Sequence, residues 1–374
     1  MIVKKKILVV FGTRPEAIKM CPLVHELKKR NSVHTIVCVT HQHKYMLDQV
    51  LEVFHIVPEY KLNIMKEQQT LFDITTDIIN GLKRIIECEM PDVILVHGDT
   101  TTAFSAALAA FYLKVPVGHV EAGLRTYDMY APFPEEFNRR VISLVSKYNF
   151  APTKNSYLNL VNEGKNVKDI WITGNTAIDT FKTTIKENYN HPELEWCKDS
   201  RMILITAHRR ESHGSKMEGM FRAINRVINE HEDVKAIYPV HLNPAVREIA
   251  LRVFPNNKRI HLIDPLDVLD FHNFIKASYL ILTDSGGIQE EAPSLGKPVL
   301  VLRDTTERPE GIHAGTIKLA GTSEDCIYNI FTELLDDEEK YYSMSKMVNP
   351  YGDGHASERI ADILEYGYVL PEHI

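Results

Sequence analysis

The chain has 374 residues, 44% of them hydrophobic, and a formal net charge of −7. This length predicts two domains, each with its own core. The acidic balance argues against a nucleic-acid partner, because no excess of Lys and Arg exists to neutralise the phosphates of a duplex. No apolar stretch approaches the ~20 residues of a membrane span, and the apolar run 7–11 is too short for the core of a signal peptide. We therefore expect a cytoplasmic protein that does not insert into a membrane.

Cofactor and metal motifs are absent from the sequence. The five cysteines form no CxxC pair and no zinc spacing, which predicts reduced and mostly buried thiols. Neither GxGxxG, GxxxxGK[ST] nor HExxH occurs, and the run 283–287 resembles a nucleophile elbow but has Thr in place of the first Gly. We expect no cofactor and no metal site.

Short β-branched runs alternate with amphipathic stretches along the whole chain. The predicted strands are residues 6–11, 35–40, 93–97, 115–120, 170–173, 202–206, 234–240, 259–263, 279–283 and 298–302. Helical spacing is found between most of them, for example in residues 18–29, 101–112, 134–145 and 217–230. This alternation predicts an α/β fold with parallel sheets and helices on both faces.

The alternation weakens between residues 175 and 201, which predicts a domain junction. We expect a first doubly wound domain over residues 1–175 and a second over 176–355. A closing helix at 356–366, within the C-terminal segment 356–374, is expected to pack back on the first domain. Ligands of such folds bind at the carboxyl ends of the strands, so the cleft between the two domains is the expected site.

Polar clusters follow several predicted strands of the first half. Residues 12–19 combine a glycine, a helix start, Arg14 and Lys19, which suits an anion, although a tight turn before a solvated helix is the alternative. Asp99, Glu121 and Glu135 also lie at strand ends or in a helix start. Helix capping would explain Asp99 or Glu135 singly. Three carboxylates at one sheet edge would raise one another's pKa, which suits proton transfer.

The second half offers groups suited to a diphosphate. His208, Arg209 and Arg210 follow a strand, and Arg matches the geometry of phosphate oxygens. His241 ends the next strand. The run 284–291 joins a strand to a helix through a serine and two glycines, where backbone N–H groups could hold a phosphate and Glu291 a ribose. A plain glycine-rich turn is the alternative for that run.

Taken together, these motifs resemble the non-hydrolysing UDP-N-acetylglucosamine 2-epimerases. The resemblance is carried, in family order, by residues 12–19, 97–102, 118–126, 134–139, 208–211, 238–243 and 282–311. It implies the GT-B architecture, with two Rossmann-like domains, UDP in the cleft and a homodimer. Hydrolysing relatives lack the Gly-Thr-Arg-Pro-Glu opening that this chain has at residues 12–16.

The resemblance also assigns roles to residues. The matching substrate-binding positions are Arg14, His241, Phe271, Ser285, Gly286, Gly287, Glu291 and Arg308. The matching catalytic positions are Lys19, Asp99, Glu121, Glu135, His208 and Arg210, of which His208 also contacts UDP. No metal ligand is among them.

The implied reaction interconverts UDP-N-acetylglucosamine and UDP-N-acetylmannosamine. UDP is eliminated to leave 2-acetamidoglucal and then adds back, with an acid and a base on opposite faces of carbon 2. Which carboxylate serves which face stays open. The alternatives are a GT-B glycosyltransferase with the same UDP site and a UDP-sugar sensor without turnover. Bacterial surface-polysaccharide synthesis is the pathway that the family implies.

Many bacterial members of the family are activated by a second UDP-N-acetylglucosamine beside the active site. At the matching positions this chain keeps Gln42, Glu135, Arg209 and His241. It has Tyr45 in place of a second Gln, and Gln68 in place of an Arg. Losing the Arg removes a charged fork for phosphate, so we predict weak or absent activation. Compensation by Lys44 or Lys66 is the alternative.

Overall fold

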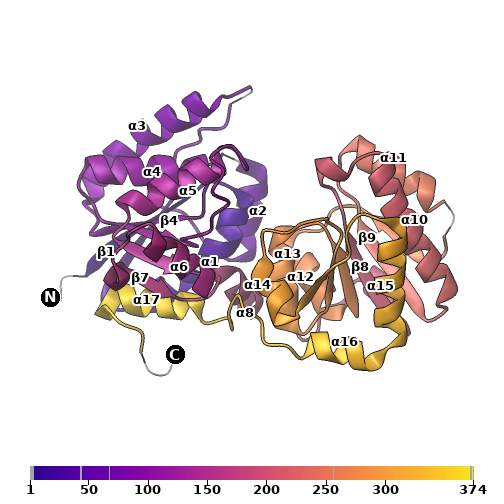
Figure 1. The fold of residues 1–374 in the computed structure, drawn as a ribbon. Coiled ribbons are helices and arrows are strands. Elements are labelled where there is room, and N and C mark those ends of the chain that lie inside the picture. Colours follow the sequence, from indigo (N-terminus) through magenta and orange to yellow (C-terminus); the bar gives the residue numbers. More distant parts are fainter. Residues whose placement is uncertain (1–3, 43, 67, 256, 371–372, 374) are drawn as a thin grey trace. The chain divides into compact units, whose positions relative to one another are not determined.

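The structure is a computed structural model that describes residues 4–42, 44–66, 68–255, 257–370 and 373. The chain forms two compact units. The first unit comprises Met1–Thr183 and Gly352–Ile374, and the second comprises Thr184–Tyr351. Each is built around its own parallel sheet with helices on both faces, which confirms the predicted fold class (Figure 1).

The first unit contains, among the described residues, a seven-stranded parallel sheet in the order β3-β2-β1-β4-β5-β6-β7. Its central strands are buried apolar runs, as expected for a sheet covered on both faces. The strands are β1 (Lys5–Phe11), β2 (Val33–Val39), β3 (Tyr60–Lys61), β4 (Val93–His97), β5 (Val117–Val120), β6 (Tyr148–Ala151) and β7 (Ile170–Ile172).

Helices cover both faces of this sheet. On one face α3 (Leu71–Glu89), α4 (Thr101–Tyr112) and α5 (Glu135–Val145) lie side by side (Figure 1). Elsewhere α1 (Arg14–Lys29) packs against α17 (Ala356–Tyr366) near the C-terminus. The remaining helical segments of this unit are α2 (Lys44–Val53), α6 (Lys154–Asn162), η1 (Val167–Asp169), α7 (Thr176–Asp179) and α8 (Phe181–Thr184).

The second unit has, over its described residues, a six-stranded parallel sheet in the order β10-β9-β8-β11-β12-β13. Its strands are β8 (Arg201–Thr206), β9 (Val234–Pro239), β10 (Ile260–Ile263), β11 (Leu280–Thr283), β12 (Val299–Val301) and β13 (Ile317–Leu319). Its helical segments are α9 (Pro192–Trp196), η2 (Arg210–Ser212), α10 (Ser215–Glu230), α11 (Pro244–Val253), α12 (Val268–Ala277), α13 (Gly286–Glu291), η3 (Ala292–Leu295), α14 (Pro309–Ala314), α15 (Glu324–Asp336) and α16 (Glu338–Ser345).

The boundaries of the units differ by a few residues from the expected ones. The first crossing lies at 183/184 rather than 175/176, and the second at 351/352 rather than 355/356. The physical reason is that α7 packs on α1 and α17, which keeps the segment after residue 175 with the first unit. Buried Asp179 of α7 accepts the Ser357 backbone N–H at 2.7 Å at the start of α17.

Three short strands, β3, β6 and β13, were not predicted. β6 reads Tyr-Asn-Phe-Ala and buries Asn149, so it lacks the apolar run that marks the central strands.

The five cysteines are free, and Cys21, Cys38 and Cys197 are buried. Within the described ranges, no helix is both long and apolar enough to cross a membrane.

Candidate active site

Two neighbouring strands of the first unit deliver carboxylates to the same sheet edge. β4 ends at His97 and β5 at Val120, and the two strands are paired in register. Gly98 turns the chain with a φ of +63°, and its N–H donates to the Val120 carbonyl at 2.9 Å. Asp99 and Glu121 therefore leave adjacent strand ends together, as the sequence predicted.

Glu121 is held by groups from three other elements. Its φ of +63° is unusual for a residue other than glycine, and such strain concentrates at functional sites. Its carboxylate forms an ion pair with the Lys19 ammonium of α1. The Asn175 side-chain N–H donates to the same Oε2 atom at 2.9 Å, and His97 Nε2 lies 3.7 Å from it. The side chain is only 9% exposed, so these partners replace water around the carboxylate.

Asp99 lies in a different electrostatic environment. It forms an ion pair with Arg139 of α5, and the Asn138 amide donates to its backbone carbonyl at 2.9 Å. Burial raises the pKa of Asp99, Arg139 opposes that rise, and the charges of Glu121 and Glu135 add to it. Within the first unit, the charges of Glu121 and Glu135 therefore both act on Asp99.

Glu135 and Glu136, the first two residues of α5, lie in different environments. Glu136 is fully buried and accepts the backbone N–H groups of Thr126 and Tyr127 at 3.0 and 3.1 Å. Glu136 thus holds the loop before α5, whereas Glu135 is half-buried. The sequence could not distinguish the two adjacent glutamates by residue type.

The loop after β1 differs from the simple anion site that its sequence suggested. Buried Glu16 accepts the Gly12 and Thr13 N–H groups at 3.0 and 2.8 Å, and Thr13 Oγ1 at 2.8 Å. Its other oxygen accepts Thr100 Oγ1 at 2.7 Å, which ties this loop to the start of α4. These backbone donors therefore already have an acceptor within the chain. Arg14, the first residue of α1, is half-buried beside them.

In the second unit, Asp284 organises two strand ends. It follows β11, is fully buried, and accepts the backbone N–H groups of His208 and Arg209 at 2.7 and 2.8 Å. Arg209 Nε also donates to the Asp284 carbonyl at 2.9 Å. The loop after β8 is thereby fixed to the loop that contains Ser285.

His208 and His241 form a stacked pair at the ends of β8 and β9. Their ring centroids lie 5.2 Å apart with the planes at 10°. Burial lowers the pKa of His241, and the neighbouring His208 lowers it further. Arg210 is exposed, and among the described residues no hydrogen bond or ion pair is found for its side chain. An exposed guanidinium beside two imidazoles suits an anionic ligand.

The remaining predicted residues lie on or next to α12, α13 and α14. A Cβ on Gly286 would lie 3.6 Å from the Arg308 guanidinium, so the backbone and this cation are close. Arg308 Nε donates to buried Glu290. Glu291 Oε2 lies 3.8 Å from His272 Nε2. Phe271 packs partly buried against the core of the same unit.

The residues of the expected regulatory site fall in both units. In the first unit, Gln42 accepts Thr102 Oγ1 at 3.1 Å, and Tyr45 is exposed. Gln68 is exposed and Lys66 pairs with Asp77 at 2.5 Å, while the side chain of Lys44 lies outside the described part. Arg209 belongs to the second unit, where it lies 3.5 Å from Glu307.

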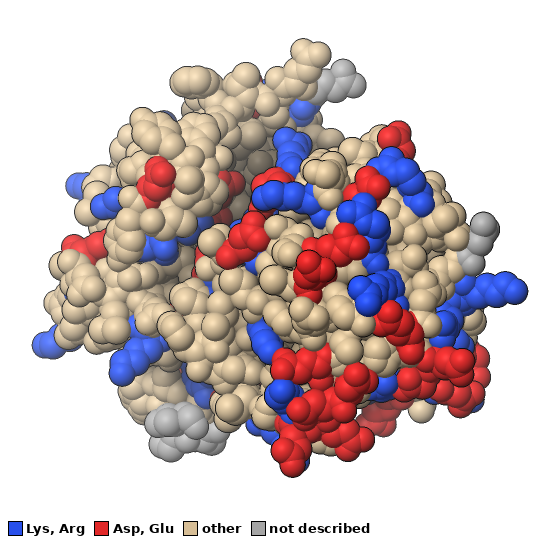
Figure 2. Space-filling model, turned by 45° about the vertical axis from the view of Figure 1, so that its right-hand side comes forward, with Lys and Arg blue, Asp and Glu red and all other residues tan. Residues whose placement is uncertain are grey.

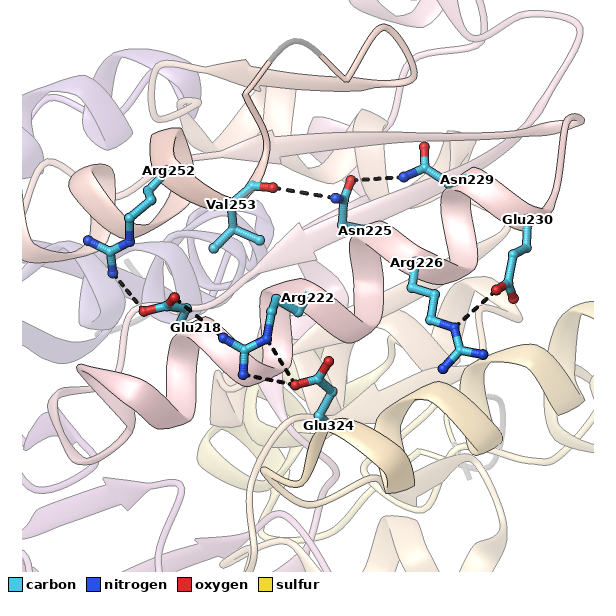
Figure 3. A pocket seen from close by; sticks show the side chains of 9 residues that line it. All are labelled: Glu218, Arg222, Asn225, Arg226, Asn229, Glu230, Arg252, Val253 and Glu324. Carbon is cyan, nitrogen blue, oxygen red and sulfur yellow. Dashed lines mark hydrogen bonds and ion pairs between the residues drawn. The ribbon is translucent and has the colours of Figure 1, made fainter.

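A separate groove on the second unit is not a candidate for the chemistry. Its volume is about 600 Å³, and its walls carry Arg222, Arg226 and Arg252 (Figure 3). Each of these arginines is paired with a glutamate, at 2.8 to 3.4 Å. Because each arginine is paired with a glutamate, the groove offers little net positive charge to an anion.

In the described ranges, no group of three or more His, Cys, Asp or Glu could hold a metal ion.

Sequence reasoning missed several residues that organise the site. His97, Arg139 and Asn175 hold or face the predicted carboxylates. Asp284 and Glu16 fix the loops. The available signals were the position of His97 at a strand end and of Asp284 before the glycine run. Nothing in the sequence linked Asn175 or Arg139 to a particular carboxylate.

Comparisons with known proteins agree with this geometry. A family described as UDP-N-acetylglucosamine 2-epimerase matches residues 25–365. A UDP-N-acetylglucosamine 2-epimerase of Bacillus subtilis (strain 168) is 57% identical, over 98% of this chain and 97% of its own.

Solved structures give the same result. The structure of S. aureus MnaA with UDP is 52% identical with a TM-score of 0.89, covering 97% of this chain and 96% of its own. A UDP-GlcNAc 2-epimerase from Neisseria meningitidis bound to UDP-GlcNAc is 48% identical with a TM-score of 0.87, covering 96% and 99%. These neighbours confirm the expected GT-B fold class of two Rossmann-like domains. The chain belongs to the UDP-N-acetylglucosamine 2-epimerase family.

Proposed function

We propose that this chain interconverts UDP-N-acetylglucosamine and UDP-N-acetylmannosamine by elimination and re-addition of UDP. The observation that carries the proposal is that Asp99 and Glu121 follow adjacent strand ends, with Glu135 acting on Asp99 and Lys19 paired with Glu121. Binding a nucleotide requires none of these carboxylates. Relatives solved with UDP or UDP-GlcNAc support the choice of ligand.

The chemistry explains why two oppositely disposed proton-transfer groups are needed. The hydrogen on carbon 2 is barely acidic, because its neighbour is an acetamido nitrogen and no carbonyl adjoins it. Breaking the anomeric C–O bond gives carbon 1 oxocarbenium character, which acidifies that hydrogen. Loss of the proton leaves 2-acetamidoglucal and UDP. UDP then returns as a proton reaches the other face of carbon 2.

The environments of two carboxylates favour different protonation states. Glu121 accepts an ammonium and an amide N–H, and both favour the ionised form that removes a proton. Burial and the charges of Glu121 and Glu135 raise the pKa of Asp99, against the opposing effect of Arg139, so Asp99 holds a proton more readily than Glu121. Pairs of groups whose surroundings separate their pKa values make suitable acid and base partners. We assign Glu121 as base and Asp99 as acid for one direction, with the roles exchanged in the other.

The second unit supplies the groups for the leaving diphosphate. We propose that Arg210, Arg308 and the backbone N–H groups of residues 285–287 bind the phosphates, and that Glu291 binds the ribose. His208 and His241 lie at the adjacent strand ends. In the first unit, we propose Arg14 and Lys19 as the cations for an anionic ligand. Such donors stabilise the charge that grows on UDP as the anomeric bond breaks.

Substituting the carboxylates separates this function from its alternatives. Asp99→Asn, Glu121→Gln and Glu135→Gln should each lower turnover by roughly 10²-fold or more, with UDP affinity kept. Glu291→Ala should weaken UDP binding instead. The matched control is Glu87→Gln, at an exposed position of α3, which should keep both turnover and UDP affinity. A glycosyltransferase or a sensor would keep its UDP-dependent behaviour in all three carboxamide variants. Near-normal epimerisation by those variants would reduce the trio to capping groups.

We also propose that the chain functions as a homodimer through the outer face of α3, α4 and α5. α4 has no charged residue, and its exposed end carries Phe111 and Tyr112. Phe72 on α3 and Phe137 and Leu144 on α5 are also exposed apolar side chains on the neighbouring helices. By contrast, the helices of the second unit carry the paired charges described above, and Figure 2 shows acidic side chains gathered low on that unit. An apolar outer face on a surface helix is typical of an interface.

The exposed area is sufficient for a stable contact. The exposed fractions of Phe72, Phe111, Tyr112, Phe137 and Leu144 are 84, 56, 65, 41 and 80%. These five side chains offer roughly 600 Å² per chain, so two copies reach the ~1,200 Å² at which stable interfaces begin. Light scattering should give twice 42.8 kDa.

Charge on this face provides the test of the dimer. Phe111→Glu with Leu144→Glu should give the single-chain mass of 42.8 kDa. Leu251→Glu on exposed α11 of the second unit is the control and should leave the dimer intact. A double variant that keeps the dimer mass would exclude this face. The cytoplasmic location stays a prediction from the composition, and the role in surface-polysaccharide synthesis stays a prediction of the resemblance.

A further inference from the structure

The strand end at His97 carries a buried imidazole that the proposed mechanism does not use. His97 is the last residue of β4 and is 4% exposed. Among the described residues, its Nε2 atom has no hydrogen-bond partner. A buried polar atom without a partner costs free energy unless another state of the protein satisfies it. Its nearest acidic atom is Glu121 Oε2, at 3.7 Å.

The next strand offers an internal comparison. His119 of β5 is also fully buried, but its Nε2 lies 2.7 Å from the Gly98 carbonyl oxygen and donates to it. The His119 imidazole thus serves the backbone of the turn. His97 instead faces a carboxylate at slightly more than hydrogen-bond distance. Among the described residues, His119 Nδ1 also has no hydrogen-bond partner, so the two rings differ in what their Nε2 atoms face: a backbone carbonyl for His119 and the Glu121 carboxylate for His97.

We infer that His97 is a positioning residue that donates its Nε2–H to Glu121 during turnover. In the unliganded chain, Lys19 is the cation on the Glu121 carboxylate. An anionic ligand bound in the first unit would compete with Glu121 for that ammonium. A movement of less than 1 Å would then bring Glu121 Oε2 within hydrogen-bond distance of His97. The carboxylate would keep its orientation and its ionised form while Lys19 turns towards the ligand.

The charge state of His97 fits this role. Burial lowers its pKa to about 4, with Glu121 opposing and Lys19 adding to the shift. The imidazole is therefore neutral near pH 7 and can donate from Nε2 without delivering a proton to the base. Among the described residues, the groups known to act on Glu121 include Lys19 of α1, Asn175 after β7, Asp99 after β4 and His119 of β5. None of them is a second neutral ring donor aimed at Oε2.

The inference rests on the proposed role of Glu121, and two variants of His97 test it. His97→Gln keeps an N–H near the Nε2 position, and His97→Met removes it with similar bulk. In His97→Met, kcat at neutral pH should fall roughly tenfold or more, because the ionised carboxylate loses a donor. The acid limb of the kcat profile should move to higher pH, since Glu121 then protonates more easily. KM and UDP affinity should change less than about threefold. In His97→Gln, the acid limb of the kcat profile should lie at the same pH as in the wild type.

A control and the remaining outcomes keep the inference falsifiable. His25→Met removes a half-buried ring that contacts the Phe54 carbonyl, far along the chain from these carboxylates, and should leave the acid limb unchanged. If His97→Met folds poorly, kcat is expressed per UDP-binding site, and its limb is compared with that of His97→Gln. An unchanged limb in His97→Met, or equal losses in both variants, would overturn the inference. If Glu121→Gln does not epimerise the substrate but His97→Met has a normal kcat and acid limb, only the inference about His97 fails. If the wild-type chain does not epimerise the substrate, the proposed function itself is wrong.

Discussion

Removing the Glu16 carboxylate should destabilise the first unit by several kcal/mol. Glu16 is 1% exposed and accepts four hydrogen bonds at 2.7 to 3.0 Å from Gly12, Thr13 and Thr100. Glu16→Ala leaves two backbone N–H groups and two hydroxyls without this acceptor. A buried donor left without its acceptor typically costs about 1–3 kcal/mol, so the loss of this acceptor should cost several kcal/mol. Glu16→Gln keeps one acceptor oxygen, so its cost should be about 1–2 kcal/mol.

The two tryptophans allow the effect to be assigned to one unit. Trp171 lies in β7 of the first unit and Trp196 in α9 of the second, and the chain has no others. In a Trp196→Phe background, urea unfolding followed by fluorescence reports on the first unit alone. The free energy of unfolding of Glu16→Ala should fall by several kcal/mol. That of Glu87→Ala, at an exposed position of α3, should fall by less than about 0.5 kcal/mol. A Glu16→Ala value within about 0.5 kcal/mol of the parent would refute the capping role.

Three further predictions concern regulation, the phosphate site and electrostatics. The reverse reaction, started from pure UDP-N-acetylmannosamine, should proceed without added UDP-N-acetylglucosamine, and a reaction that stays silent until it is supplied would show an intact second site. Gly286→Ala should leave thermal stability unchanged, because its Cβ meets only ordinary 3.6 Å contacts, yet raise the Kd for UDP about tenfold if the backbone binds phosphate. Hydrogen bonds from Lys318 and Lys340 lower the pKa of Glu333 to about 2. The contribution of Glu333 to stability should therefore be present above pH 4.5 and lost as the pH falls towards 2. In a carboxyl NMR titration, Lys340→Met should return the pKa of Glu333 towards its usual value.

The regular elements of the fold were predictable because their patterns are local. β4 and α4 have the bounds expected from the sequence, since an apolar run ends at His97 and a threonine cap precedes the helix. α1 begins at Arg14 rather than at residue 18, because Pro15 occupies the first turn and Glu16 completes the cap. The short strand β6 escaped notice because Asn149 interrupts its apolar character.

The site was predictable only in part. Strand ends identified Asp99 and Glu121, because residues that follow adjacent parallel strands must share one sheet edge. The partners that set their charge states come from elements far away in sequence. Arg139 reaches Asp99 across 40 residues, and Asn175 reaches Glu121 across 54. Such pairings depend on tertiary packing, which no local pattern encodes.

The hydrogen on carbon 2 provides the most direct test of the central claim. The pure protein is incubated with UDP-N-acetylglucosamine in D₂O, and carbon 2 is followed by proton NMR. If carboxylates remove and return that proton, UDP-N-acetylmannosamine should appear and both epimers should acquire deuterium at carbon 2. Glu121→Gln should show neither change. Epimerisation that keeps the original hydrogen at carbon 2 would contradict proton exchange by Asp99 and Glu121, and no epimerisation at all would contradict the proposed function.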